Sequence, residues 1–294
     1  MRALGQDADA QSQDQPDASS HTGLMTDTAV NLSDTSTWLP LDGLAPGFDA
    51  NKAPHSRALV GREIVTTDPT GERIAYRFAE HTVECAGHSD PYEAFEVDEQ
   101  LYFVQFHDGQ RPAEAVSLVL DLRNGSALRI RSAILTEEER RPGQTRVQQT
   151  FAASVLEGSA TEHAVPAPTN ALIGRRVLWV YSDQHAYEHI YLSPQWYTWQ
   201  CLAGPEKGLA DTDENSVWEI RPGIYVFAWR EKVIPCASVT IADHRNIHAM
   251  RSHGALFGLD ETGIIPTHFT FGAFGRLLSA TLHPAAYDPA APIR

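Results

Sequence analysis

Residues 171–204 read ALIGRRVLWVYSDQHAYEHIYLSPQWYTWQCLAG, and residues 58–87 read ALVGREIVTTDPTGERIAYRFAEHTVECAG, an altered copy of the same text. Three further blocks recur in the same order along the chain: residues 95–109 resemble 218–232, residues 116–124 resemble 237–246, and residues 145–158 resemble 266–279. Collinear repetition over roughly a hundred residues indicates duplication of a whole domain and argues against a solenoid of short repeats.

Each copy shows the two-residue period of β-strands. Val177, Trp179 and Tyr181 fall on one face of a strand, and the residues between them fall on the other. Turn signals follow about every ten residues, the spacing of an antiparallel meander, and only the charged run 136–141 carries a helical signal. The sequence therefore predicts an all-β protein of two tandem up-and-down barrels, each packed solid or holding one small ligand.

Composition places the domain boundaries. Residues 1–37 consist mainly of Asp, Ser, Gln and Thr, which cannot bury enough apolar surface to offset the entropy of ordering. From Trp38 onward, aromatic and Leu residues are interleaved with Pro and Gly, which suits an arm docked on a folded body. We predict, in chain order, a disordered tail (1–37), an extended arm (38–57), an N-terminal barrel (58–158), a linker (159–170) and a C-terminal barrel (171–288).

The chain is acidic, with 294 residues and a formal net charge of −15 at pH 7. This charge repels phosphate backbones and anionic lipids, so we expect neither a nucleic-acid nor a membrane partner. No stretch reaches the ~20 apolar residues of a membrane span, the amino terminus lacks the order of a secretory signal, and the three cysteines show no C-x-x-C spacing. These features predict a cytoplasmic protein with reduced thiols, either a monomer whose barrels form a pseudo-dimer or a homodimer.

The histidines of the second copy are spaced so that pairs could share a strand face; they are His185, His189, His244, His248, His253 and His268. No H-E-x-x-H motif or carboxylate triad accompanies them, so we expect no metal site. Of these side chains, His189 is the one we expect to reach a pocket. Because Gly-rich phosphate loops and nucleophile elbows are also absent, we expect no cofactor and no serine hydrolysis.

Glu231 is the strongest candidate for a catalytic group. It follows Trp229 on the same face of a strand whose other members are aromatic. If that face points into the barrel, burial raises the pKa of the carboxyl group, as a proton donor near neutral pH requires. In the alternative interpretation, Glu231 is an ordinary strand-end residue in the polar turn formed with Arg230 and Lys232.

The duplicated arrangement, with L-[VI]-G-R opening both copies at Leu59 and Leu172, resembles the molybdenum cofactor biosynthesis F (MoaF) family over about residues 38–288. The resemblance implies a calycin (lipocalin-like) fold for each barrel. The family name reflects genetic association, so it implies little about the reaction.

The second copy is also similar to the phenolic acid decarboxylases, whose pattern is [FL]-I-G-x-x-h-h-x-x-Y, then Y-E-x-I-Y, then V-Y-x-V-S-W-x-E. The corresponding text here is LIGRRVLWVY, YEHIYL with one extra residue, and IYVFAWRE. The resemblance implies that Tyr181 is one of that family's paired active-site tyrosines and that Glu231 is its proton-transferring glutamate. Tyr187 and Trp199 fall on aromatic pocket positions.

The sequence departs from that pattern in both copies. Trp179 replaces the first paired tyrosine, and the expected arginine falls near Leu209, with only Lys207 close by. In the first copy, Thr67 and Asp108 stand roughly where Tyr181 and Glu231 stand in the second. We therefore expect the N-terminal barrel to be structural.

Two functions remain open, beside a third possibility of a scaffold with solid barrels. The first is a cofactor-free acid–base enzyme, lyase- or decarboxylase-like, acting on a small aromatic and in particular phenolic compound in the C-terminal barrel. The alternative is a lipocalin-like protein that binds a small apolar or pterin-like ligand in molybdenum cofactor biosynthesis. The enzyme hypothesis assigns catalysis to Glu231, Tyr181 and Tyr187, and substrate binding to Trp179, His189, Tyr191, Trp199 and Trp229.

Overall fold

A computed structural model of the chain describes residues 35–159 and 165–292. The predicted disordered tail therefore lies outside the described residues, apart from its last three, Thr35–Thr37, which form a 3-10 turn. Within the described ranges the regular structure is almost entirely β. Its helical elements are α1 (Leu41–Leu44) and the 3-10 turns at Thr35–Thr37 and Ala285–Tyr287.

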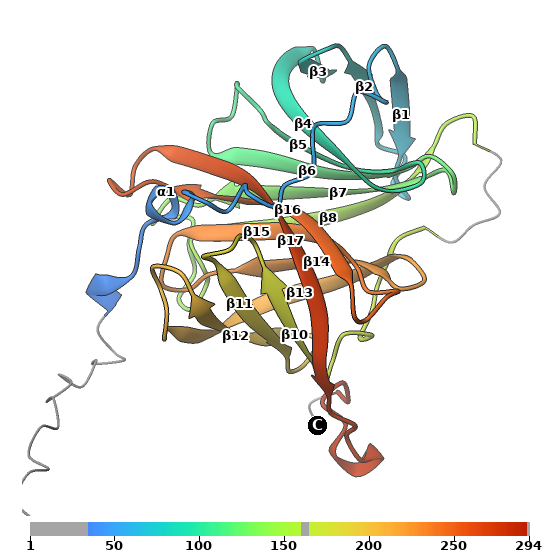
Figure 1. Cartoon of the computed structure of the whole chain (residues 1–294). Coiled ribbons are helices and arrows are strands. Elements are labelled where there is room, and N and C mark those ends of the chain that lie inside the picture. The colour runs from blue at the N-terminus through green and yellow to red at the C-terminus, as the bar shows by residue number, and fades with distance from the viewer. Residues whose placement is uncertain (1–34, 160–164, 293–294) are drawn as a thin grey trace, which may run out of the picture. The chain divides into compact units, whose positions relative to one another are not determined.

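The first eight strands form a closed antiparallel barrel in which each strand pairs with the next (Figure 1). The last strand pairs back on the first through Thr66 with Leu156 and Thr67 with Val155. The strands are β1 (Glu63–Thr67), β2 (Arg73–Phe78), β3 (Thr82–Cys85), β4 (His88–Asp98), β5 (Leu101–His107), β6 (Glu114–Asp121), β7 (Ser126–Ile134) and β8 (Val147–Leu156).

A second barrel repeats this order and closes where β10 pairs with β17. The short strand β9 (Ala167–Pro168) adds to the outside of β13. Its own strands are β10 (Arg175–Val180), β11 (Ala186–Tyr191), β12 (Trp196–Ala203), β13 (Ala210–Arg221), β14 (Ile224–Arg230), β15 (Cys236–Asp243), β16 (Met250–Leu259) and β17 (Pro266–Ala280). The prediction of an all-β protein with two tandem antiparallel barrels is confirmed.

The prediction of a helical segment at residues 136–141 is wrong. Thr136 N donates to Glu139 Oε2 (2.8 Å) and Glu139 N donates to Thr136 Oγ1 (3.3 Å), the reciprocal pair that starts a helix. The chain nevertheless makes only a turn at residues 137–139. A Pro-Gly pair at 142–143 follows, and proline disfavours the helical conformation of the residue before it.

The duplication is visible in the turn that opens each barrel. Gly61 N donates to Phe78 O (2.7 Å), and Gly174 N donates to Tyr191 O (2.9 Å) at the corresponding place. Both glycines have a positive φ, +78° and +84°, which residues with a Cβ adopt only at a cost. The repeated glycine of the L-[VI]-G-R motif is therefore a backbone requirement of the barrel entrance.

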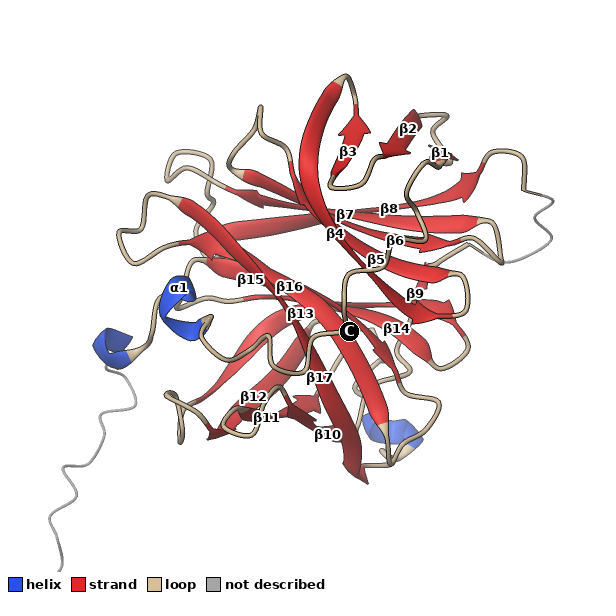
Figure 2. Ribbon diagram, turned by 45° about the horizontal axis from the view of Figure 1, so that its top comes forward, coloured by secondary structure: helices blue, strands red, loops and turns tan. Residues whose placement is uncertain are grey.

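The barrels pack against each other through the outer faces of central strands (Figure 2). Strands β5, β6, β14 and β15 are therefore buried on both faces, because one face fills their own barrel and the other fills the contact. Arg221 crosses this contact: its Nη2 and Nε donate to the two carboxylate oxygens of Asp121 (2.7 and 2.8 Å), and its Nη1 donates to Asp98 (2.7 Å). Arg221 and Asp121 are 3% and 1% exposed.

The predicted arm docks on the C-terminal barrel. Asn51 donates from its backbone N to Tyr181 O (3.2 Å) and from Nδ2 to Val180 O (3.0 Å), which fixes the arm at the end of β10. Before this point the arm contains α1 and is not extended throughout. Phe48 inserts its ring beside that of Tyr181, with centroids 4.8 Å apart. The arm thus closes one end of the second barrel.

Candidate functional site

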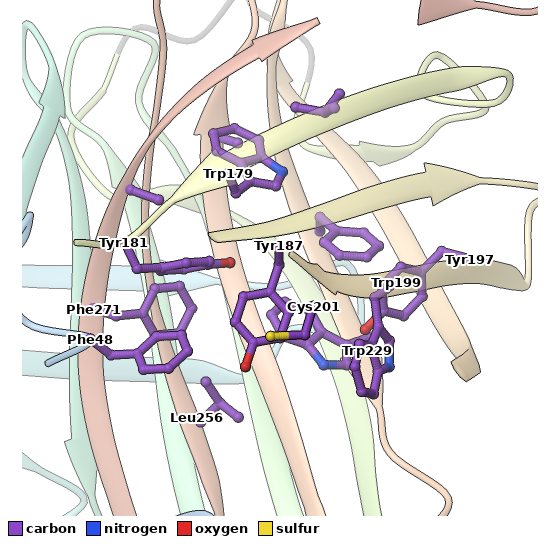
Figure 3. Packing of buried hydrophobic residues seen from close by; sticks show 14 of the residues in the cluster. Phe48, Trp179, Tyr181, Tyr187, Tyr197, Trp199, Cys201, Trp229, Leu256 and Phe271 are labelled. Carbon is purple, nitrogen blue, oxygen red and sulfur yellow. The ribbon is translucent and has the colours of Figure 1, made fainter. Parts of the chain in front are cut away.

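A cavity of about 60 Å³ lies inside the C-terminal barrel. Its wall is mainly aromatic, and Figure 3 shows Tyr187, Trp199 and Trp229 grouped opposite Tyr181 and Phe48. Six of the eight residues predicted from the sequence line it: Tyr181, Tyr187, His189, Trp199, Trp229 and Glu231. The structure therefore brings most of the predicted set to one place, while their roles stay predictions.

Trp179 and Tyr191, the other two predicted residues, do not line this cavity. They line a neighbouring space of about 10 Å³, which is too small for an organic ligand. Tyr181 and His189 form part of both walls and so separate the two spaces. Tyr191 is 2% exposed and lies in the same hydrophobic cluster as Trp179.

Strand pairing explains why these side chains meet. Tyr187 is opposite Trp179 on β10 and opposite Cys201 on β12, and His189 is opposite Trp199. Because side chains on neighbouring strands that are in register point to the same side of the sheet, the inward positions of β10, β11 and β12 form one continuous surface. Tyr181 and Tyr187 stand edge to face, with centroids 5.9 Å apart.

Glu231 lies directly after β14 and is only 8% exposed. Its backbone N donates to Cys236 O (3.0 Å), so the chain at Glu231 stays paired with β15 and does not turn outward. Its Oε2 has no hydrogen-bond partner among the described residues. Burial, together with the neighbouring Asp213 carboxyl group, raises the pKa of Glu231 well above its ordinary value. Glu231 is therefore a buried acid, not a strand-end residue in solvent.

Asp213, on β13, is the partner that sequence reasoning missed. It is 0% exposed and accepts hydrogen bonds from Trp199 Nε1 (2.9 Å) and Lys232 N (3.3 Å). Burial raises the pKa of Asp213, whereas Glu231 and Trp199 lower it. Since these donors stabilise a charged Asp213, we assign the proton of the pair to Glu231.

Glu206 is a second missed acid, in the turn after β12. Tyr187 Oη donates to Glu206 Oε2 (2.9 Å), and Glu206 is 5% exposed. Burial raises the pKa of Glu206, and burial together with the nearby Glu206 carboxyl group raises the pKa of Tyr187. The cavity therefore carries two acidic groups on its wall, Glu206 and Glu231, and no lysine or arginine among the described residues that line it.

His189 completes the polar part of the wall. Burial lowers its pKa to about 3, so the ring is neutral at physiological pH. Its Nδ1 has no hydrogen-bond partner within the described ranges. His185 instead packs on Phe48 and bonds Ser182 (2.9 Å), while His253 stacks on Phe95 in the contact between the barrels. No group of three or more His, Cys, Asp or Glu able to hold a metal occurs among the described residues.

Sequence comparisons match both halves of the molecule. Residues 36–136 match the profile of the MoaF N-terminal domain, and residues 166–281 match that of the MoaF C-terminal domain. The chain belongs to the MoaF family. It is 32% identical over 273 residues to Protein MoaF of Klebsiella aerogenes, an alignment that covers 86% of this chain and 99% of that protein.

The cavity draws on both matched regions. Leu44 and Phe48 fall in the part matched to the MoaF N-terminal domain, whereas Glu206 and Glu231 fall in the part matched to the C-terminal domain. The site thus depends on both domains of a MoaF protein. No helix in the described part of the chain is long and apolar enough to cross a membrane.

Proposed function

We propose that this MoaF protein is a cofactor-free acid–base catalyst that transfers a proton to and from a small phenolic compound in the C-terminal barrel. The observation that carries the proposal is the buried carboxyl group of Glu231, which lies beside Asp213 with its Oε2 unpartnered among the described residues on the wall of an aromatic cavity. An unpartnered polar group in a buried cavity favours a ligand that completes its hydrogen bonding.

The wall offers both groups that a phenol reaction needs. Glu231 supplies a proton to carbon, and Glu206, which accepts a hydrogen bond from Tyr187, takes the phenol proton through that hydroxyl. For para-vinylphenol, the Glu231 proton forms a C–H bond at the terminal vinyl carbon, the phenol O–H bond breaks, and a quinone methide and the Glu231 carboxylate result. Reversal returns one methyl proton to Glu231, so atoms and charge balance over the cycle.

Charge on the wall selects a neutral substrate. The described lining residues include two carboxyl groups and no cation, so a carboxylate ligand would lose its hydration without gaining a counter-ion. The sequence lacks the arginine that the decarboxylase pattern would place near Leu209. The described residues that line the cavity supply no other arginine in its place. A neutral phenol fits this environment better than a cinnamate anion.

The arm must shift for a phenol to fit. An aromatic ring needs a cavity of roughly 150 Å³, whereas the cavity measures about 60 Å³ with Leu44 and Phe48 on its wall. The Phe48 ring occupies space beside both Tyr181 and Tyr187, with centroids 4.8 and 5.8 Å away. Displacing this ring enlarges the cavity on the side of the Tyr181 and Tyr187 rings.

Deuterium exchange tests the proposal without knowledge of the natural substrate. In D₂O, the protein should place deuterium on the terminal vinyl carbon of para-vinylphenol, followed by NMR. Glu231→Gln should reduce the exchange rate by about 10² or more, the size of effect typical of a lost general acid. Glu261→Gln changes an exposed carboxylate and should leave the rate unchanged. Meta-vinylphenol, which forms no para-quinone methide, should not exchange. Absence of exchange by the wild type, or full exchange by Glu231→Gln, would refute the assignment.

The carrier hypothesis predicts a different result from the same variants. The missing cation and the closed aromatic wall favour it, because binding requires the wall but no proton transfer. Tryptophan quenching by neutral phenols and by pterins measures affinity directly, since Trp199 and Trp229 line the cavity. Tight binding that Glu231→Gln leaves unchanged, combined with no exchange in the wild type, would establish a carrier.

A further inference from the structure

The N-terminal barrel, which the sequence led us to expect to be structural, contains a larger cavity than the C-terminal barrel. The volume of this larger cavity is about 560 Å³, some nine times that of the C-terminal cavity. Ligand pockets commonly measure about 300–1,000 Å³. Apolar side chains form one part of the wall: Ile74, Tyr76, Phe106 and Val116. The inference drawn from this cavity does not depend on the function proposed for the other barrel.

Strand β7 directs two arginines into this barrel. Leu128 and Ile130 belong to the cluster between the barrels, so they point outward from the N-terminal barrel. Because side chains alternate along a strand, Arg129 and Arg131 point to the inside, and both line the cavity. Guanidinium groups on the interior face of a barrel are costly unless they have an anionic partner.

These arginines have spare hydrogen-bond donors. Arg129 Nη2 donates to Glu72 (3.1 Å) and Arg131 Nη1 donates to Glu114 (3.0 Å). Each guanidinium carries five N–H groups and uses one of them in a hydrogen bond to the described residues. The Glu72 side chain is 53% exposed, so water can satisfy it if Arg129 turns to a ligand. The fork geometry of arginine suits a carboxylate or a phosphate.

Tyr76 supplies an independent sign of a missing partner. It is 1% exposed and lines the cavity, and its Oη forms no hydrogen bond of normal geometry with the described residues, although the Thr66 hydroxyl is near. Burial and the neighbouring Cys85 raise the pKa of Tyr76, and the charge of Arg129, which lines the same cavity, opposes that rise. A ligand oxygen between the two groups would accept a hydrogen bond from each.

We propose that the N-terminal barrel binds a small amphipathic organic anion. Its carboxylate or phosphate group contacts Arg129 and Arg131 and accepts a hydrogen bond from Tyr76. Its apolar or aromatic body packs on Phe106 and Val116. The barrel that lacks counterparts of Tyr181 and Glu231 is thus a second binding site with the opposite charge preference, and not a solid support.

A matched pair of fluorescent probes tests this site. Anilinonaphthalene sulfonate carries an anionic group on an aromatic body, and phenylnaphthylamine has a closely similar body without charge. The full-length protein should bind the anionic probe, and Arg129→Gln should weaken that binding about tenfold while leaving the neutral probe unchanged. Arg123→Gln alters an exposed arginine outside the cavity and should change neither affinity. Glu231→Gln should also have no effect, which separates this site from the C-terminal one.

Two further measurements identify the head group of the ligand and provide a second variant in case Arg129→Gln does not fold. Displacement of the probe by benzoate, phenyl phosphate and inorganic phosphate distinguishes carboxylate from phosphate and shows whether the apolar body is needed. Tyr76→Phe keeps the ring and should weaken the anionic probe about threefold, so it serves if Arg129→Gln is unfolded by circular dichroism. Equal affinity for both probes in the wild type, or unchanged binding of the anionic probe in folded Arg129→Gln and Tyr76→Phe, would overturn the proposal.

Discussion

The two barrels share a backbone and differ in what they enclose. Both have eight antiparallel strands in the same order and open with the same glycine turn. The first encloses about 560 Å³ with five arginines and four carboxyl groups on the wall, whereas the second encloses about 60 Å³ with aromatic rings, two acids and no arginine or lysine among the described lining residues. Duplication thus preserved the features that close a barrel, while the inward positions, which do not affect closure, changed to different chemistry.

The carboxyl groups of the two barrels reflect this difference. In the first barrel, the hydrogen bond from Arg111 lowers the pKa of Asp108 although burial opposes it. In the second, burial and a second carboxyl group raise the pKa of Glu231. In the first barrel an arginine thus favours the charged form of the carboxyl group, whereas in the second burial favours the neutral form.

Removing the arginine that joins the barrels should have the largest effect. Arg221→Met leaves Asp121 buried without a counter-ion and should destabilise the protein by about 3–5 kcal/mol. All six tryptophans lie in the arm and the C-terminal barrel, so tryptophan fluorescence reports only on these parts. In the variant, the urea unfolding curve followed by fluorescence should therefore differ from the curve followed by circular dichroism. Arg245→Met also removes a contact to Asp98, but Arg245 is 46% exposed, so a loss below about 1 kcal/mol is expected. Equal losses of stability in Arg221→Met and Arg245→Met would contradict this prediction.

The two entrance glycines should respond unequally to alanine. Both have a positive φ, which costs a residue with a Cβ about 1 kcal/mol. A Cβ at Gly61 meets nothing within 4 Å, whereas one at Gly174 lies 2.4 Å from Thr281 O. Gly174→Ala should therefore lose about 3 kcal/mol and Gly61→Ala about 1 kcal/mol in urea unfolding. A loss at Gly61 as large as that at Gly174 would contradict this prediction, because the contact with Thr281 would then not decide the cost.

Removing the Phe48 ring from the arm should affect the C-terminal barrel alone, because its ring contacts are with Tyr181, His185, Tyr187 and Phe269 of that barrel. Phe48 is 6% exposed, and Phe48→Ala should cost about 2 kcal/mol from lost burial while widening the cavity beside Tyr181. Neutral phenols should then quench tryptophan fluorescence faster in stopped flow, with no change in binding of the anionic probe by the other barrel. Leu282→Ala, at a side chain 92% exposed, is the control. Slower quenching in Phe48→Ala would mean that the arm helps to form the site.

The raised pKa of Glu231 and the lowered pKa of Asp108 should change the stability of the protein in opposite directions as pH varies. The folded state keeps a proton on Glu231 that the unfolded state releases above its ordinary pKa, so this group makes stability fall as pH rises, by at most about 1.4 kcal/mol per pH unit. Asp108, whose pKa is lowered, makes stability fall as pH decreases. Glu231→Gln should flatten the decline above pH 5 in urea titrations at several pH values. An unchanged profile would show that Glu231 is ionised in the folded protein.

Much of the fold could be predicted because its signals are local. Alternation along strands such as β10, glycines at turns and the repeated blocks all depend on near neighbours in sequence, and they indicated two barrels and an arm. The helix prediction for residues 136–141 failed because Thr136 and Glu139 form the hydrogen bonds of a helix start, but no helix follows them. For the site, alternation placed Trp229 and Glu231 on one face of a strand without deciding whether that face points inward, whereas Glu206 lies in a turn, where no period applies.

The sequence by itself determined the class of fold, the duplication and the aromatic faces of the strands in the second half, because a strand pattern repeats every two residues whatever surrounds it. Only the tertiary structure decided that Asp213 lies against Glu231, that Phe48 closes the cavity, and that Arg129 and Arg131 face the interior of the first barrel. Those relations depend on strand register and on contacts between residues far apart in the chain. Burial, charge pairing and cavity volume arise only when such residues are brought together.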